Sequence, residues 1–223
     1  MMKRREELQL VTRTWRAESA VAYQMVDACS LASLQMNGPT MRSLGVVSTI
    51  RGEGRSSVAI AMAVVQQRDY RRRVVLLEMD FERPSLARRV EADPAPGLAE
   101  LVRGEASIHD VLQPLAEGMS TVTAGAGAGA GPRLIVDFMA SGLLQELMGQ
   151  FDVVVADLPP LLGSSFAVQA AGLFERTLLV VRSGVTPVAQ IREAIASMPV
   201  EPLVLLNAVE SSQPGWLRRR TGT

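Results

Sequence analysis

Apolar runs alternate with helical patterns along most of the chain. Five near-continuous apolar runs are typical of strands buried on both faces of a parallel sheet: Leu44–Ser48, Arg73–Asp80, Phe151–Asp157, Arg176–Ser183 and Pro202–Asn207. Helical spacing follows the first run from Ser56 and recurs from Val188 to Ser197. The pattern predicts an α/β fold, a doubly wound and mostly parallel sheet with helices on both faces. Ligands of such sheets bind at the carboxyl ends of the strands.

A long helix is predicted ahead of the first strand, from about Arg5 to Met36, because this segment lacks proline and glycine. The breaker cluster Asn37–Thr40 ends it. We therefore expect an N-terminal helical arm over residues 1–40 and one α/β domain over residues 41–223. Within the domain, PGLAELVRG and SIHDVLQPL read as helical pieces, and the alternating segment Ala124–Gly131 reads as a flexible loop or a lid.

Composition narrows the kinds of partner and compartment. The chain has 23 basic and 23 acidic residues and a formal net charge of +0, so no overall basic field favours nucleic acid or an anionic membrane. A single cysteine, Cys29, and a single histidine, His109, exclude a disulfide framework and a zinc site of Cys/His spacing. No apolar stretch is long enough to span a bilayer, which predicts a cytoplasmic protein without a transmembrane segment.

A glycine-rich turn follows the first predicted strand. Thr49–Ser56 lies between a strand and a helix, where a phosphate-binding loop of the form GxxxxGK[ST] would lie. Gly52 and Gly54 would let successive backbone N–H groups face phosphate, and the helix N-terminus would add its dipole. Arg55 stands at the lysine position, Ser56 at the position of the magnesium ligand, and Thr49 replaces the first glycine. The predicted nucleotide contacts are Gly52, Glu53, Gly54, Arg55, Ser56 and Ser57.

Carboxylates end two of the predicted strands. Glu78 and Asp80 follow one apolar run and Asp157 follows another, so parallel strands would bring them together beside the glycine-rich turn. In P-loop enzymes such carboxylates hold the magnesium shell and orient the reacting groups. We therefore predict a Mg²⁺ site of Ser56, Asp80 and Asp157, and catalytic roles for Asp80, Asp157 and Arg55.

Three motifs together resemble a known family. GEGRSS, LLEMDFERPSL and VVVADLPPLL are similar to the phosphate loop and the two acidic segments of bacterial tyrosine-kinase domains from polysaccharide co-polymerases, which are relatives of partition and division-site ATPases. The resemblance implies a P-loop NTPase fold that binds ATP or ADP with Mg²⁺, with Asn207 near the adenine. It also implies a role in exopolysaccharide or capsule synthesis. The implied partner is a membrane-bound chain-length-determinant protein, which would hold the chain at the inner membrane.

Several residues depart from the family pattern. Arg55 replaces lysine, Glu78 replaces the first aspartate of DxD, and Phe166 stands about where an aspartate is usual. The tyrosine-rich tail is missing, and the only tyrosines are Tyr23 and Tyr70. These departures predict a weakened kinase or a pseudokinase with little autophosphorylation. Two alternatives remain open at this point: an active ATPase of the partition or positioning type, and an interaction scaffold that does not bind nucleotide.

The N-terminal arm bears on self-association. In the family, arginines at three-residue spacing after a glutamate pack neighbouring subunits into rings. Val21 and Gln24 stand at those two positions here. The resemblance implies a homo-oligomer, while these two replacements remove the arginines that would form it.

Overall fold

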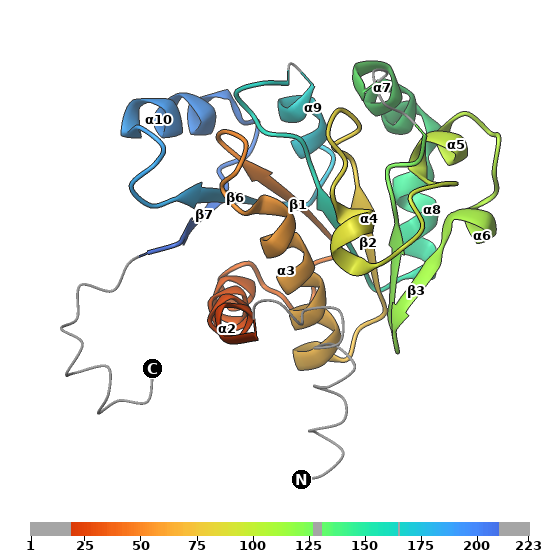
Figure 1. Cartoon of the computed structure of the whole chain (residues 1–223), viewed down its shortest axis with the longest axis horizontal. Helices are drawn as coiled ribbons and strands as arrows, with labels where there is room; N and C mark the ends of the chain where they lie inside the picture. The colour runs from red at the N-terminus through yellow and green to blue at the C-terminus, as the bar shows by residue number, and fades with distance from the viewer. Residues whose placement is uncertain (1–18, 127–130, 165, 210–223) are drawn as a thin grey trace, which may run out of the picture.

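The computed structural model describes residues 19–126, 131–164 and 166–209 (Figure 1). The predicted arm is therefore seen from Ser19 onward, and its first part, residues 5–18, lies outside the described residues. Part of the alternating Gly-Ala segment, residues 127–130, also lies outside them. No helix of the described part is both long and apolar enough to cross a membrane.

Seven strands form one sheet in the order β3-β4-β2-β5-β1-β6-β7 (Figure 1). Their bounds are β1 Ser43–Ser48, β2 Val74–Glu78, β3 Gln113–Ala116, β4 Met119–Val122, β5 Val153–Asp157, β6 Arg176–Arg182 and β7 Leu203–Asn207. All neighbours are parallel except β3 and β4. β1, β2 and β5 are buried along their whole length, as their apolar runs predict. The predicted doubly wound α/β fold is confirmed.

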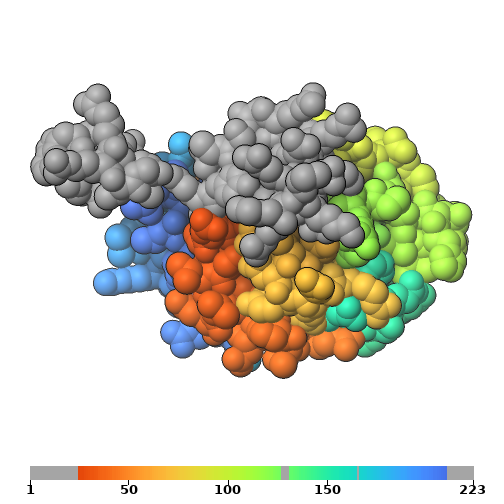
Figure 2. Space-filling model, turned by 90° about the horizontal axis from the view of Figure 1, so that it is seen from below, coloured from red at the N-terminus to blue at the C-terminus, as the bar shows by residue number. Residues whose placement is uncertain are grey.

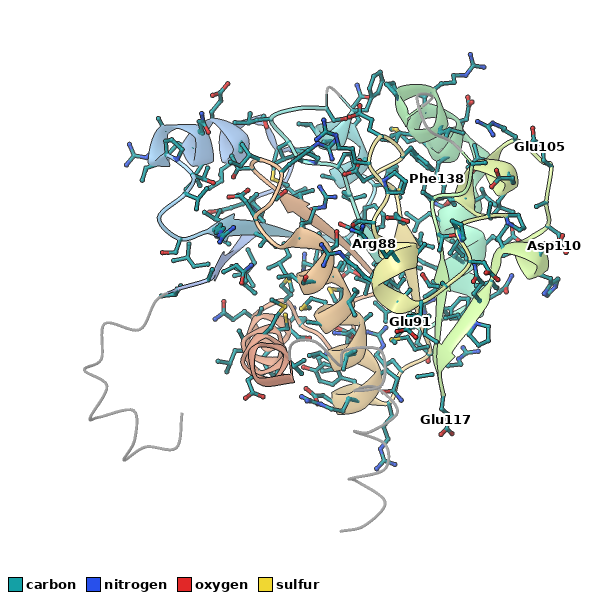
Figure 3. The ribbon with its side chains drawn as sticks, viewed as in Figure 1. Arg88, Glu91, Glu105, Asp110, Glu117 and Phe138 are labelled. Atoms are coloured by element: carbon teal, nitrogen blue, oxygen red, sulfur yellow. The ribbon has the colours of Figure 1, made fainter. Side chains whose placement is uncertain are left out.

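Helices cover both faces of the sheet (Figure 1). Their bounds are α2 Ser19–Gln35, α3 Arg55–Tyr70, α4 Leu86–Val90, α5 Leu98–Val102, α6 Ile108–Val111, α7 Gly131–Ser141, α8 Leu143–Gln150, α9 Ala167–Ala171 and α10 Val188–Ser197. One apolar cluster joins α2, α3 and α4 to one face of the sheet, and a second joins the other helices to the opposite face. Phe138 of α7, labelled in Figure 3, is a fully buried member of the second cluster.

Helix α2 packs on α3 and shares its apolar cluster; Figure 2 shows the two helices side by side. The buried Gln66 amide donates a hydrogen bond to Ser33 Oγ at 2.8 Å, and Arg72 Nη1 donates to Gln66 Oε1 at 2.9 Å and to the Gly38 carbonyl. Cys29 lies fully buried in α2, and burial raises the pKa of its thiol to about 12.

Two segments form elements that were not predicted. Residues Gln113–Ala116 form an edge strand, whereas the sequence predicts that they continue a helix; Pro114 is compatible with an edge because it has no N–H to donate to a ladder. The segment after the Gly-Ala stretch, for which the sequence analysis gives no element, forms two helices, α7 and α8, with Gly142 at φ 74° between them. Neither difference changes the layer order.

Candidate functional site

The glycine-rich turn connects β1 to α3 at the carboxyl edge of the sheet. Gly52 and Gly54 have φ 86° and 91°, in the left-handed region that glycine adopts without steric penalty. A Cβ on Gly54 would lie 2.2 Å from the Asn207 amide nitrogen, so the loop also needs the absence of a side chain there. Gly54 precedes the first residue of α3, a helix of 16 residues whose N-terminus has no side-chain cap. The backbone therefore has the form expected of an anion cradle.

Glu53 and Asn207, both predicted to lie at the nucleotide, support this loop with their side chains. The buried Glu53 carboxylate accepts hydrogen bonds from Ile50 N at 2.8 Å, Arg182 N at 3.1 Å and Thr186 Oγ1 at 2.5 Å. The Asn207 amide donates to the Glu53 carbonyl at 2.8 Å. These hydrogen bonds hold the loop against the ends of β6 and β7. Sequence reasoning missed Thr186, which no motif marks.

Arg55 turns towards the acidic strand ends. Its Nε donates to Asp157 Oδ1 at 2.5 Å, and its Nη2 donates to Asp80 Oδ2 at 2.9 Å. All three side chains are buried, with Asp80 and Asp157 2% and 1% exposed. Burial opposes the charge of Arg55, but the two carboxylates outweigh it and raise the pKa of Arg55 above its ordinary value. The predicted convergence of Asp80 and Asp157 beside the loop is observed, and the guanidinium lies between them.

Arg51 adds a second cation at the rim of this cluster. Its Nη1 donates to Asp80 Oδ2 at 2.7 Å, and its Nη2 donates to Glu82 Oε2 at 2.9 Å. The side chain is 31% exposed, unlike that of Arg55. Asp80 also accepts a hydrogen bond from Arg83 N at 3.2 Å. Both oxygens of Asp80 are therefore engaged within the chain.

Two buried oxygens have no hydrogen-bond partner among the described residues, Thr49 Oγ1 and Asp157 Oδ2. Such atoms usually mark a place for water or a ligand. The backbone cradle fits a phosphate group, whereas Asp157 Oδ2 lacks a hydrogen-bond donor in the described part of the chain. The carboxylates do not fit a magnesium ion in this arrangement, because the guanidinium lies between them, and the described residues hold no cluster of three or more His, Cys, Asp or Glu side chains suited to a metal.

The buried Glu78 carboxylate binds backbone N–H groups of two neighbouring loops. It pairs with Asp157 in the β2–β5 register, but its carboxylate turns to the N-terminus of α4. Oε1 accepts from Leu86 N at 2.6 Å and from Ser85 N, and Oε2 accepts from Ala124 N at 3.3 Å. Burial raises the pKa of Glu78 above its ordinary value of 4.5, while these backbone donors oppose the rise. Glu78 thus anchors two loops.

The buried state of Glu78 predicts a pH effect on stability. A carboxyl whose folded pKa lies above its unfolded pKa binds protons more tightly in the folded state, so stability falls as pH rises from about the unfolded value through the folded value. Glu78→Gln keeps an acceptor for the α4 N–H groups and does not titrate. We expect the melting temperature of the wild type to fall relative to Glu78→Gln as the pH rises above about 4.5, because the folded pKa of Glu78 is raised. If the melting temperatures of the two proteins had the same dependence on pH, Glu78 would not be the titrating group.

The remaining predicted site residues lie around the same loop. Ser56 Oγ lies 3.3 Å from Ser85 Oγ, and Ser57 Oγ accepts a hydrogen bond from Arg89 Nη1 at 3.3 Å. Phe166 precedes α9 and packs against the apolar cluster on that face. The side chains at the two arm positions Val21 and Gln24 lie outside the described part of the chain.

The sheet order, the glycine turn before α3 and the carboxylates after β2 and β5 define a P-loop NTPase-like α/β protein. No family model matches the chain. Tyrosine-protein kinase YwqD of Bacillus subtilis is 25% identical over 170 residues, covering 76% of this chain and 71% of YwqD. The succinoglycan biosynthesis transport protein ExoP of Rhizobium meliloti is 27% identical over 167 residues, covering 73% of this chain.

Solved structures agree with these relatives. The tyrosine kinase domain of BceF is 26% identical with a TM-score of 0.69, covering 83% of this chain and 75% of that one. The VpsO kinase domain is 23% identical with a TM-score of 0.73, covering 92% and 98%. The chain is therefore related to bacterial tyrosine-kinase domains, as its motifs predict. It spans 21% of ExoP and 15% of the tyrosine-protein kinase Ptk of Acinetobacter johnsonii.

A more distant neighbour shares the fold with ligands bound. Cobyrinic acid a,c-diamide synthase of Mycobacterium smegmatis, solved with bound ADP and magnesium, has a TM-score of 0.60 and is 22% identical over 77% of this chain and 76% of that chain. At this identity the likeness shows the fold alone.

Proposed function

We propose that the chain is a nucleotide-binding, tyrosine-kinase-like regulator of exopolysaccharide or capsule polymerisation and export, with weakened or absent kinase activity. The proposal is carried by the Gly52–Ser56 loop, whose two left-handed glycines lie at the N-terminus of a long helix. ATP or ADP would bind there through its phosphates. The neighbour that carries ADP on the same fold supports this choice of ligand.

The Arg55 contacts support weakened catalysis. In this family the equivalent lysine faces phosphate, whereas Arg55 forms two ion pairs with Asp80 and Asp157. Phosphoryl transfer depends on charge stabilisation and positioning, and a cation engaged by carboxylates is less available for the transferred group. The Mg²⁺ site predicted at Ser56, Asp80 and Asp157 stays a prediction, and a metal ion there would compete with Arg55 for the two carboxylates.

The position of Tyr70 also argues against autophosphorylation within one chain. Tyr70 ends α3, and the phosphate loop begins the same helix. At a rise of about 1.5 Å per residue the two ends are roughly 22 Å apart. Tyr70 therefore cannot receive a phosphoryl group from its own loop without unfolding the helix.

The relatives support the cellular role and the partner. YwqD and Ptk are named tyrosine-protein kinases and ExoP is named a biosynthesis transport protein, which favours a partnership with a membrane-bound polysaccharide co-polymerase. The charge balance of the chain favours this protein partner over nucleic acid. In this proposal the chain lies in the cytoplasm and reaches the inner membrane through that partner.

Replacing Gly54 with alanine tests nucleotide binding at the loop. A Cβ at φ 91° is strained and would collide with the Asn207 amide, so the cradle should lose its shape. In calorimetric titrations with ADP and ATP in magnesium buffer, we expect Gly54→Ala to bind at least about tenfold more weakly than wild type.

Gly142→Ala is the matched control for this experiment. Gly142 also precedes a helix with positive φ, 74°, but a Cβ there meets no atom within 4 Å and the residue lies away from the loop. Equal nucleotide affinity of wild type and Gly54→Ala would show that the loop is not the phosphate site. No binding to wild type would favour the interaction scaffold, and rapid hydrolysis would favour the partition-type ATPase.

A further inference from the structure

The Arg55 guanidinium makes the contacts through which a metal ion would link two strand-end carboxylates. Nε binds Asp157 and Nη2 binds Asp80, while Nη1 has no hydrogen-bond partner among the described residues. One cation therefore joins both acidic segments and keeps a third nitrogen uncommitted. A lysine ammonium is a compact point charge, whereas the planar guanidinium fork can bind two carboxylates from different nitrogens at once.

The charge around this cluster is already nearly balanced. Two guanidinium groups, Arg51 and Arg55, face three carboxylates, Asp80, Glu82 and Asp157, which leaves one negative charge. A divalent ion bound to Asp157 Oδ1 and Asp80 Oδ2 would have to displace Arg55 from both. Displacement would leave a guanidinium that is now 10% exposed without its two ion pairs.

The unpartnered oxygen of Asp157 provides an independent observation. Asp157 is 1% exposed, and its Oδ2 has no hydrogen-bond partner although its Oδ1 binds Arg55. Thr49 Oγ1, at the start of the glycine-rich loop, is buried without a partner as well. These two atoms indicate a polar site beside the loop that the chain's own side chains do not fill.

We infer that Arg55 takes the place of the divalent metal ion in this site, so that the nucleoside di- or triphosphate binds here in its metal-free form. The nucleotide part of this inference rests on the proposed function, while the exclusion of metal rests on the ion pairs alone. The backbone cradle holds the phosphates, and Arg55 offers them its Nη1, because its Nε and Nη2 bind the carboxylates.

Titration of the wild-type protein with ADP, in excess magnesium and in excess EDTA, tests the inference. We expect the two dissociation constants of the wild type to agree within about twofold. Arg55→Lys, whose ammonium cannot bind both carboxylates through separate nitrogens, should bind ADP at least about tenfold more tightly with magnesium than with EDTA. Arg73→Lys is the matched control, because Arg73 forms an exposed ion pair with Asp152, and it should behave as wild type.

Wild-type affinity that falls about tenfold or more in EDTA would overturn the inference, and this arm needs no variant. An Arg55→Lys protein as indifferent to magnesium as the wild type would overturn it too, because residue 55 would not then decide metal use. Absence of ADP binding under both conditions would overturn the proposed function. The replacement of the metal ion by Arg55 is then tested with manganese alone.

Manganese alone decides the metal part. Paramagnetic resonance titration of Mn²⁺ into wild type and Arg55→Ala should detect saturable binding in the variant and none in the wild type. In the variant the Asp157 carboxylate is freed, and Asp80 keeps only its contacts with Arg51 and the Arg83 N–H. Binding to the wild type, or to neither protein, would overturn the replacement of metal by Arg55.

Discussion

Asp157→Ala is expected to lower the free energy of unfolding by about 3–4 kcal/mol, because removing one partner of a buried ion pair leaves the other charge buried and under-compensated. Arg55 would keep only Asp80, and the short contact from its Nε to Asp157 would be lost. Urea or guanidinium denaturation at neutral pH measures the change through the midpoint and slope.

Asp137→Ala is the control for this measurement. Asp137 pairs with Arg133 across one turn of α7, and the arginine side chain is 82% exposed. Exposed pairs of this kind contribute about 0.3–0.5 kcal/mol. If Asp157→Ala destabilised the protein no more than Asp137→Ala, the buried ion pairs would not hold the loop to the strand ends.

Gly97→Ala is expected to destabilise the protein by about 3 kcal/mol, at the upper end for overpacking, because the obstructing atoms belong to the backbone. A Cβ on Gly97 would lie 2.4 Å from the Thr123 carbonyl oxygen and 2.5 Å from Gly125 N. The adjacent bonds from Leu98 N to Thr123 O, 2.8 Å, and from Ala99 N to Ala124 O, 3.0 Å, fix this approach. The start of α5 would have to move away from the end of β4.

Gly149→Ala is the control and is expected to raise stability, whereas Gly97→Ala lowers it. Gly149 lies within α8, and a Cβ there meets no atom within 4 Å, so alanine should raise stability by about 0.4–1 kcal/mol through the unfolded chain. Denaturation curves of both variants separate the effect of steric contact from that of backbone entropy. A Gly97→Ala protein as stable as wild type would mean that α5 and the β4 loop can separate freely.

Much of the fold could be predicted from the sequence, because the long apolar runs are central strands buried on both faces. The runs that become β1, β2 and β5 are fully buried, and their parallel order follows from the helices between them. The edge was harder to predict. Pro114 and its neighbours continue a helical pattern in the sequence, yet they pair with β4, since tertiary pairing overrides local spacing.

The candidate site was predictable in position but not in its contacts. The order of loop and acidic segments brings Arg55, Asp80 and Asp157 together, since parallel strands share their carboxyl edge. The direction of the Arg55 side chain is not encoded in the motif, because phosphate and carboxylate both attract a guanidinium. Glu53 and Glu78 belong to the same motifs, yet their carboxylates also bind the distant backbone N–H groups of Arg182 and Ala124, and only the folded structure shows those donors.

The reactivity of Cys29 can report whether α2 is packed on α3. It is the only cysteine of the sequence, it is fully buried where α2 packs on α3, and its pKa near 12 keeps the thiol protonated and unreactive in the packed state. Alkylation of the native protein therefore requires that α2 first open, and its rate under native conditions measures the free energy of that local opening. The rate of Cys29 alkylation therefore reports how often α2 detaches from α3, without any added label.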